Sequence, residues 1–282
     1  MYTNVFLISD GYLSFDVLGF LKEMDLKLSR SVIWNCGSTG ALIVFLKCLG
    51  FTWDQMTTKL NSLSCLPNII YGGSLEPGVS KDIKREIVSW MMDIINSKRV
   101  FSQDTTMKEV YKLTGIFPNM LTSKGSINPK SHPDVTLLDA VLASMCNFGV
   151  YDTHKIDDEE YTSFIKYNVF PLGVDVKMDG ISTETLYIAN YSKLTNIEVF
   201  SVFDGIENKL SQEYFDRVHK IAEQTEEPNF VLINGVFSKN DLASYDIDNR
   251  MDNGKQHARM FNRSESTLSY MDTIISNIKN QS

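Results

Sequence analysis

The chain has 282 residues, of which 43% are hydrophobic, and a net charge of −8 with a sequence pI of about 5.1. This acidic balance argues against a nucleic-acid-binding surface, which carries a basic field. The N-terminus has no basic region ahead of its short apolar run, and no run approaches the ~20 apolar residues of a membrane-spanning helix. We therefore expect a cytoplasmic or other intracellular protein without a transmembrane segment, and peripheral association with a membrane stays open.

Strands and helices alternate over the first fifty residues. Residues 5–8 form a short apolar run typical of a strand buried on both faces, and residues 17–24 have the apolar spacing of a helix. A second strand at residues 32–34 and a second helix from Thr39 follow. This alternation predicts adjacent parallel strands joined by right-handed crossovers, with both carboxyl ends at the edge where such sheets hold their sites.

The rest of the chain continues this mixture of elements. We expect Gly50 to end the second helix, and Thr52 with Gln55 forms the capping-box pattern that begins the next one. The remaining expectations are helices over 81–98, 106–111, 135–144, 213–224 and 266–278, strands over 186–190, 198–202 and 230–234, an irregular polar stretch over 119–134, and a polar, mobile segment over 246–264.

The cysteines give no sign of a metal centre. Each lies in or beside an apolar segment, and their spacing is not that of metal ligands. The four are Cys36, Cys48, Cys65 and Cys146. The pattern predicts buried free thiols in a reducing compartment, and we expect neither a metal nor a cofactor.

Residues 31–44 form the segment most informative about chemistry. They read as an apolar strand, a turn of small residues and an apolar helix, with Ser38 at the tip of the turn. A serine on such a strained corner presents its hydroxyl near the backbone N–H groups that follow it. The corner needs small residues two positions before and two after the serine. The residues that form this elbow around Ser38 are Cys36, in place of the usual first glycine, Gly37, Thr39 and Gly40.

Over roughly residues 5–190 the chain resembles the patatin-like phospholipase family. Members have a G-G-G-x-R/K-G loop after the first strand, a G-x-S-x-G elbow, and later an Asp-Gly turn that leads to an Asn and a Pro. Residues 9–14 align with the loop, 36–43 with the elbow and 168–174 with the segment after the turn. The resemblance implies a three-layer α/β fold with a mainly parallel central sheet, formed by a domain over 1–205 and a C-terminal extension over 206–282.

The chain departs from the family at the catalytic dyad. The resemblance implies that Ser38 attacks an ester carbonyl while an aspartate accepts its proton. Counting back from Asn168 and Pro171, the aspartate position falls on Ser163, and the following glycine position falls on Phe164. A serine hydroxyl is not a base at neutral pH, and phenylalanine does not readily adopt the positive φ that glycine allows.

The oxyanion loop is also altered. In the family its glycine amides hold the oxyanion that forms during attack. Here the loop residues are Asp10, Gly11 and Tyr12, and only Gly11 keeps a family glycine. Ser9, Asp10 and Ser14 stand at the other glycine positions, and an inward-facing Asp10 carboxylate would oppose a developing negative charge. We therefore expect that this loop does not present two amides toward Ser38.

Other groups could supply the missing base. The acidic run at residues 157–160 precedes the lost aspartate position, although such a run is typical of a solvated hairpin tip. Asp-Gly pairs at 179–180 and 204–205 fall too late for the aligned segment and indicate turns. A Ser–His–Asp triad also stays open, because its members need not be close in sequence. Its candidates are His132, His154, His219 and His257.

These observations predict a patatin-like protein that has lost most or all ester hydrolysis and serves as a scaffold, a structural subunit or a binding subunit. The alternative is an active lipid acyl hydrolase of the phospholipase A type that uses Ser38 with a non-standard base. Acyl transfer to an acceptor other than water shares the same first step. Either function fits a lipid or lipid-ester ligand, a protein partner or self-association. Abundant Asn, Lys, Ile and Ser are typical of an AT-biased genome, such as that of a virus or a parasite.

Overall fold

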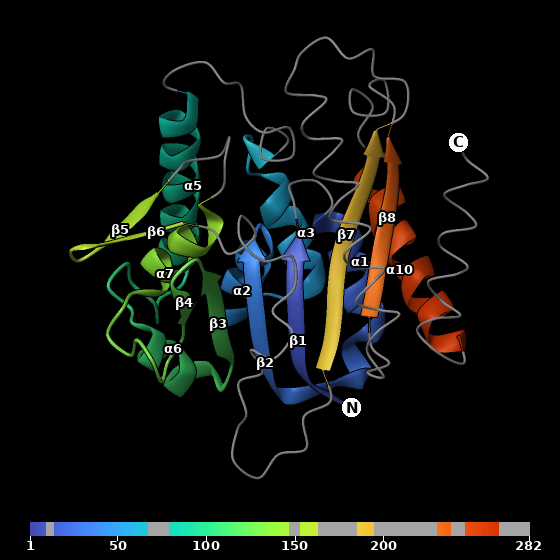
Figure 1. Cartoon of the computed structure of the whole chain (residues 1–282), viewed down its shortest axis with the longest axis horizontal. Helices are drawn as coiled ribbons and strands as arrows, with labels where there is room; N and C mark the ends of the chain where they lie inside the picture. The colour runs from blue at the N-terminus through green and yellow to red at the C-terminus, as the bar shows by residue number, and fades with distance from the viewer. Residues whose placement is uncertain are drawn as a thin grey trace. The chain divides into compact units, whose positions relative to one another are not determined.

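The computed structural model describes residues 1–9, 14–66, 79–146, 153–162, 185–194, 230–237 and 246–264 (Figure 1). The chain divides into two compact units. The first comprises Met1–Ser14 and Leu26–Thr185, and the second comprises Phe15–Asp25 and Leu186–Ser282. The predicted boundary at residue 205, the expected strand over 198–202 and the expected helices over 213–224 and 266–278 lie outside the described residues.

The first unit contains a mainly parallel sheet. Its strands lie in the order β4-β3-β2-β1, with β1 parallel to β2, β2 parallel to β3, and β4 antiparallel to β3. Val5 is in register with Trp34, as expected for the two adjacent strands predicted from their apolar runs. The bounds are Tyr2–Ser9 for β1, Leu28–Ser38 for β2, Phe117–Thr122 for β3 and Gly125–Ile127 for β4.

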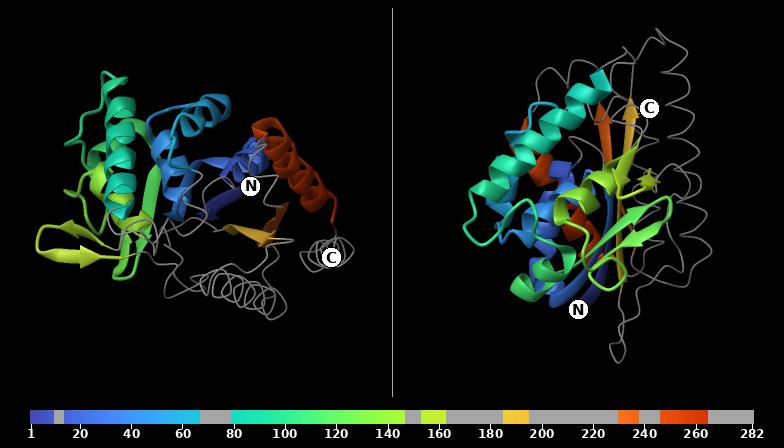
Figure 2. Two further views of the ribbon diagram at one scale, coloured as in Figure 1. Left: turned by 90° about the horizontal axis from the view of Figure 1, so that it is seen from above. Right: turned by 90° about the vertical axis from the view of Figure 1, so that its left-hand side faces the viewer.

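Helices of the first unit lie to one side of these strands in both views of Figure 2. Ser144 of α7 donates a hydrogen bond to the Cys36 carbonyl of β2, and the ring centroids of Phe45 in α2 and Trp90 in α5 lie 6.2 Å apart. A short antiparallel hairpin, β5 (His154–Ile156) with β6 (Glu159–Tyr161), completes the unit. The helices are α2 (Gly40–Cys48), α3 (Trp53–Asn61), α5 (Val79–Asn96), α6 (Met107–Thr114) and α7 (Leu137–Met145).

The helix boundaries follow local chemistry that the sequence shows. Gly50 has a φ of +76° just after α2, which confirms it as the residue that ends this helix. Thr52 and Gln55 form both hydrogen bonds of the predicted capping box at the start of α3. Thr106 and Glu109 form a second capping box at the start of α6. These contacts satisfy backbone groups that have no partner within the helices.

The expectation of an irregular stretch over 119–134 is wrong, because β3 and β4 occupy its first part. All six residues of β3 are buried, including Asn119. Its side-chain amide donates to Asn35 Oδ1 at 2.6 Å and accepts from Asn128 Nδ2 at 2.9 Å. A buried polar side chain is compatible with a strand when its hydrogen bonds are made internally, and the partner on β2 cannot be found from local sequence.

The second unit contains α1 (Ser14–Met24) and β7 (Thr185–Leu194), each apart from its first residue. It also contains β8 (Phe230–Phe237), which is parallel to β7, and α10 (Ile247–Arg263). The expectation of a mobile segment over 246–264 is wrong, because α10 fills it. A Cβ added at Gly254 would lie 1.8 Å from the Asp16 carbonyl oxygen, and one at Gly19 would lie 2.0 Å from the Met251 carbonyl oxygen. The two helices therefore pack backbone to backbone, which only glycine permits at these positions.

A buried polar group explains why the polar sequence of α10 forms a packed helix. Asp16 of α1 accepts a hydrogen bond from Asn253 at 2.7 Å and lies 3.4 Å from Arg250 Nη1. Burial raises the pKa of Asp16 to about 6, and the Arg250 charge acts in the opposite direction. Arg259 and Glu23 form a further ion pair at 3.0 Å. Arg250, Asn253 and Arg259 are therefore contacts between the two helices rather than residues of a mobile loop.

Candidate functional site

Ser38 lies at a strand-to-helix corner, as predicted. It is the last residue of β2, and α2 begins two residues later at Gly40. Its φ is +52°, a region that non-glycine residues adopt at a cost of about 1–2 kcal/mol. The residue is 2% exposed. This backbone conformation is the strained one that a nucleophile elbow requires.

The two glycines of the elbow have different roles. A Cβ added at Gly40 would lie 2.6 Å from the Leu7 carbonyl oxygen on β1, which is closer than a real Cβ approaches backbone. A Cβ added at Gly37 would meet nothing within 4 Å. The prediction that a small residue is needed two positions after Ser38 is therefore confirmed, and Gly37 carries no comparable steric requirement.

Cys36 takes the place of the first family glycine by burying its side chain. Its Sγ lies 3.2 Å from Met120 Sδ and 3.9 Å from the Asn119 carbonyl oxygen, both on β3. Burial raises the pKa of the Cys36 thiol well above its usual range and raises that of Cys48 to about 12. All four cysteines are buried and free, as predicted, so these two thiols stay protonated at neutral pH.

Three buried hydroxyls connect the elbow to both ends of the oxyanion loop. Thr39 Oγ1 donates to the Ser9 carbonyl oxygen at 2.6 Å, and the Thr39 amide donates to the same oxygen at 3.0 Å. Ser14 Oγ donates to Thr39 Oγ1 at 2.9 Å and lies 2.9 Å from Ser9 Oγ. Two positions that hold glycine in the family therefore hold side chains that bond to each other and to the elbow.

Thr39, rather than Ser38, is the N-cap residue of α2. Its side chain makes no capping bond to the helix: its hydroxyl accepts a hydrogen bond from Ser14 Oγ and donates one to the Ser9 carbonyl oxygen. The start of the helix is held through β1, by contacts between elements that the sequence analysis did not predict.

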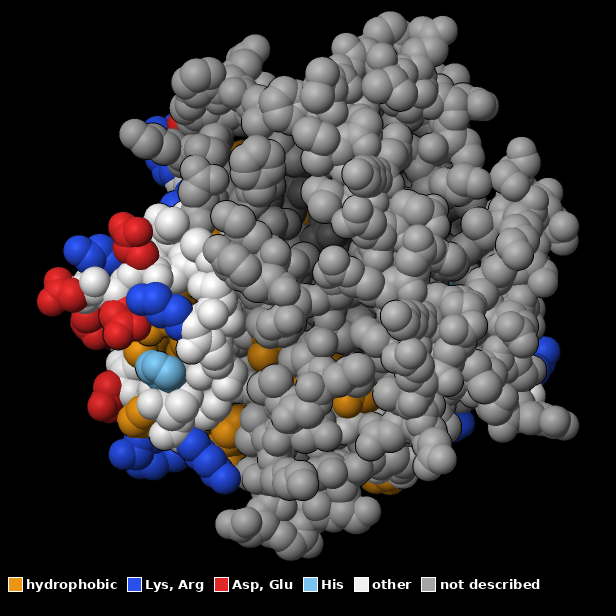
Figure 3. All heavy atoms as spheres, viewed as in Figure 1, with side chains coloured by type: hydrophobic (Ala, Val, Ile, Leu, Met, Phe, Trp, Pro, Cys, Tyr) orange, Lys and Arg blue, Asp and Glu red, His pale blue; other side chains and the backbone are white. Residues whose placement is uncertain are grey.

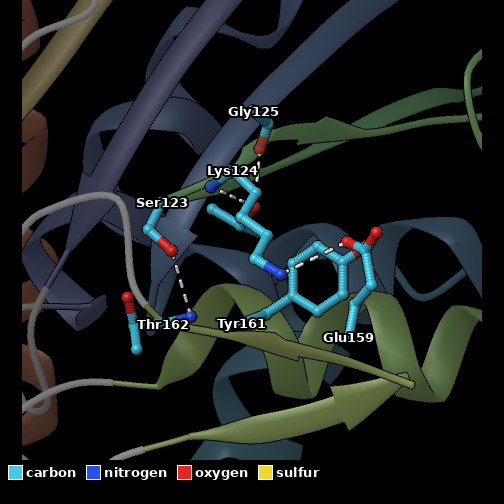
Figure 4. Close-up of polar contacts among 7 residues, drawn as sticks. Ser123, Lys124, Gly125, Glu159, Tyr161 and Thr162 are labelled. Atoms are coloured by element: carbon cyan, nitrogen blue, oxygen red, sulfur yellow. Dashed lines mark hydrogen bonds and ion pairs between the residues drawn. The ribbon is translucent and has the colours of Figure 1, made fainter. Parts of the chain in front are cut away.

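Ser123 and Thr162 join the turn after β3 to the segment that follows β6 (Figure 4). The Ser123 amide donates to the Thr162 carbonyl oxygen at 2.9 Å, and the Thr162 amide donates to Ser123 Oγ at 3.2 Å. Cys36 and Met120 are in register, and two residues further along, Ser38 and Thr122 end their strands. Thr162 is therefore held at the same edge of the sheet as the elbow.

The acidic run at residues 157–160 forms the tip and second strand of the β5–β6 hairpin, as expected. All four residues are exposed, and acidic side chains gather over this hairpin in Figure 3. Glu159 Oε2 lies 3.3 Å from Lys124 Nζ and accepts from Tyr161 Oη at 3.3 Å. The Lys124 ammonium also lies 5.3 Å from the centre of the Tyr161 ring. These contacts attach the hairpin to the β3–β4 turn (Figure 4).

A histidine–carboxylate pair is present that the sequence analysis did not identify. His154 Nε2 lies 3.0 Å from Asp139 Oδ1, and this hydrogen bond holds the pKa of Asp139 below its usual range. In a Ser–His–Asp triad the serine bonds to Nε2, but here the carboxylate occupies that nitrogen. His132 Nδ1 lies 2.8 Å from Ser131 Oγ. His257 belongs to the second unit, where burial lowers its pKa to about 4.

Several predicted site residues lie outside the described residues. They are Asp10, Gly11 and Tyr12 of the oxyanion loop, Ser163 with Phe164, and His219. The aligned segment over 168–174 and the Asp-Gly pairs at 179–180 and 204–205 also lie outside them. The expectations for these positions stay predictions.

The described part of the chain contains no group of three or more His, Cys, Asp or Glu side chains that could hold a metal ion. Among the same residues, no helix is both long and apolar enough to span a membrane.

No protein-family model and no curated protein matches the chain. The chain does match solved structures. VipD from Legionella pneumophila has a TM-score of 0.53 and 10% identity, covering 92% of this chain and 66% of VipD. The type III effector ExoU has a TM-score of 0.44 and 13% identity over 96% of this chain and 53% of ExoU. ExoU in complex with SpcU, from Pseudomonas aeruginosa, has a TM-score of 0.42 and 10% identity, with 93% and 53% covered.

The similarity to VipD shows the fold. VipD has a patatin-like fold, and the chain shares its α/β architecture with a mainly parallel central sheet. The chain spans 66% of the length of VipD and about half the length of ExoU. The fold is therefore patatin-like, as the resemblance of the loop and elbow segments implied.

Proposed function

We propose that the protein is a patatin-type module that keeps the elbow as part of its architecture but has lost most or all ester hydrolysis. It acts as a scaffold, a structural subunit or a binding subunit. One observation carries this proposal. Thr162 is anchored to the turn after β3, at the edge of the sheet where Ser38 ends β2. The next residue in the chain is the one that the resemblance aligns with the family aspartate, and it is Ser163.

Without a carboxylate at that position, Ser38 lacks the expected acceptor for its proton. General-base assistance is worth roughly 10²–10⁴ in rate, and one oxyanion donor about 10²–10³. The described ends of the oxyanion loop support a second loss. Ser9 and Ser14 fill glycine positions with buried hydroxyls that bond to each other and to Thr39. Loss of both contributions would leave hydrolysis near background.

The second candidate is an acyl hydrolase acting on phospholipids or other lipid esters through Ser38. The positive φ of Ser38 favours it, because a strained non-glycine residue often marks a functional position. In this case an acid or base outside the aligned position would accept the proton. A lipid or lipid-ester ligand is common to both candidates.

Hydrolysis of phospholipid vesicles and short-chain esters separates the two. We expect the purified protein and its Ser38→Ala variant to hydrolyse both substrate classes at the same background rate. Ser163→Asp should stay within a few-fold of that rate, because Asp10 and Phe164 remain. Turnover by the unchanged protein that disappears in Ser38→Ala would establish the acyl hydrolase instead.

A further inference from the structure

We propose that the first unit carries a basic–aromatic surface that docks on membranes containing anionic phospholipids. This surface consists of Lys59, Lys98, Arg99 and Val100, and its two lysines lie over the buried ring of Phe51. The inference rests on the proposed function in one respect, since it names the partner of a binding subunit. It requires no chemistry at Ser38.

Two lysines converge on one aromatic ring. Lys98 Nζ lies 3.7 Å from the centre of the Phe51 ring, and Lys59 Nζ lies 5.9 Å from it. Phe51 follows the end of α2, Lys59 belongs to α3, and Lys98 comes just after α5. Two segments far apart in the sequence, α3 and the residues after α5, therefore bring these two charges to the ring that follows α2. The lysine stems help to cover the ring, which leaves Phe51 only 8% exposed.

The positive charges of this surface are not neutralised by neighbouring carboxylates. Among the residues that the structure describes, Lys59, Lys98 and Arg99 form no ion pair with Asp or Glu. The chain as a whole carries eight more acidic than basic side chains. Three unpaired cations at one place are therefore a local reversal of the overall charge, and they complement an anionic partner.

An exposed aliphatic residue favours a membrane over a soluble anion as that partner. Val100 is 66% exposed and directly follows Lys98 and Arg99 in the chain. Cationic side chains beside an exposed apolar one are the combination that binds an anionic lipid interface, where the charges meet headgroups and the apolar group enters the boundary. A compact phosphate site would instead gather several donors around one point, including backbone N–H groups.

The surface is separate from the elbow. Helix α2 begins at Gly40, directly after the elbow, and its nine residues span about 13 Å before the turn that leads to Phe51. Docking through this surface therefore does not depend on the Ser38 hydroxyl. For this reason vesicle binding and ester hydrolysis can be measured as independent properties of the same protein.

Co-sedimentation with vesicles tests the proposal. We expect the full chain to bind phosphatidylcholine vesicles that contain phosphatidylserine more tightly than pure phosphatidylcholine vesicles. The triple variant Lys59→Gln, Lys98→Gln, Arg99→Gln should bind the anionic vesicles about 10²-fold more weakly, because each cation near a membrane surface contributes about fivefold. Val100→Ser should weaken binding several-fold, and raised salt should weaken it in the unchanged protein.

A matched control removes three exposed lysines elsewhere in the same unit. The variant Lys108→Gln, Lys130→Gln, Lys155→Gln has the same net charge as the first triple variant and should bind almost as tightly as the unchanged protein. Ser38→Ala should also bind normally, whatever its hydrolysis assay shows. Thermal unfolding of each variant confirms that it is folded.

Four results would overturn the docking surface. They are no binding to either vesicle, equal binding to both, equal losses in the two triple variants, and displacement by inorganic phosphate at matched ionic strength. The last would assign the cations to a soluble phosphate. By contrast, Ser38-dependent hydrolysis together with the expected vesicle results would overturn the proposed function and leave the docking surface standing.

Discussion

Ser38 combines a strained backbone with a buried side chain, and the strain can be measured separately from the hydroxyl. Both Ser38→Gly and Ser38→Ala remove the hydroxyl, but only glycine adopts a φ of +52° without steric cost. We expect Ser38→Gly to be more stable than Ser38→Ala by about 0.5–1 kcal/mol, after allowing for the greater entropy of glycine in the unfolded chain. Urea unfolding of the two variants measures this difference, and equal midpoints would mean that the corner is not strained.

Gly40 and Gly37 provide a matched pair at the same elbow. Gly40→Ala places a Cβ 2.6 Å from the Leu7 carbonyl oxygen, so β1 or α2 must shift. We expect a loss of about 1–3 kcal/mol, as for other overpacked sites. Gly37→Ala meets nothing within 4 Å and should change stability by less than about 0.5 kcal/mol. Thermal unfolding compares the two, and a tolerated Gly40→Ala would contradict the close approach of β1 to the elbow.

At the scale of elements, the packing of α1 against α10 has a specific pH dependence. The pKa of Asp16 is raised from 3.8 to about 6, so between these values the folded state holds a proton that the unfolded state has lost. This contribution to stability grows as the pH falls from about 6 to about 4. The pKa of His257 is lowered from 6.5 to about 4, so its contribution decreases as the pH falls through the same window.

The two contributions oppose each other, and variants should separate them. Relative to the unchanged protein, Asp16→Asn should lose stability as the pH falls from 6 to 4, with a slope of about 1.4 kcal/mol per pH unit. His257→Gln should gain stability over the same range. Denaturant unfolding at several pH values measures both slopes, and slopes equal to that of the unchanged protein would contradict the burial of Asp16 and His257.

Local sequence predicted the elements whose determinants are local. The apolar strands at residues 5–8 and 32–34, Gly50 after α2 and the capping box at Thr52 are all confirmed. By contrast, β3 and α10 were assigned to irregular structure because both contain polar residues. Asn119 and Asp16 find their partners 84 and 237 residues away in sequence, on Asn35 and Asn253. No local pattern reveals such contacts.

The candidate site also has one part that local sequence predicts and another that depends on contacts between distant segments. The elbow around Ser38 was predictable because strand, turn and helix are contiguous in the chain. The hydroxyl contacts among Ser9, Ser14 and Thr39, and the anchoring of Thr162 by Ser123, depend on segments that meet only in the folded sheet. The pairing of His154 with Asp139 was missed for the same reason, since the two residues approach through β5 and α7.

At the scale of the whole molecule, a patatin-like fold does not establish a patatin-like activity, because function depends on the residues of the site. The chain keeps the strand-to-helix corner at Ser38. The resemblance aligns Ser163 with the aspartate that serves as the base in the family. About one helix length from that corner, Lys59 and Lys98 lie over Phe51 and form no ion pair with any residue that the structure describes. These features are the basis of our proposal that the fold is retained for binding rather than for turnover.

Labelling of Ser38 by a fluorophosphonate probe tests the central claim most directly, because the probe reacts with serine hydroxyls whose proton is removed during attack. Intact-mass and peptide analysis after incubation of the purified protein measures the labelled fraction at this residue. We expect the unchanged protein as a whole to be labelled no faster than the Ser38→Ala variant, with no label on the peptide that contains Ser38, since Ser163 supplies no base. Rapid stoichiometric modification of Ser38 in the unchanged protein, absent from Ser38→Ala, would contradict the loss of catalysis and establish the acyl hydrolase.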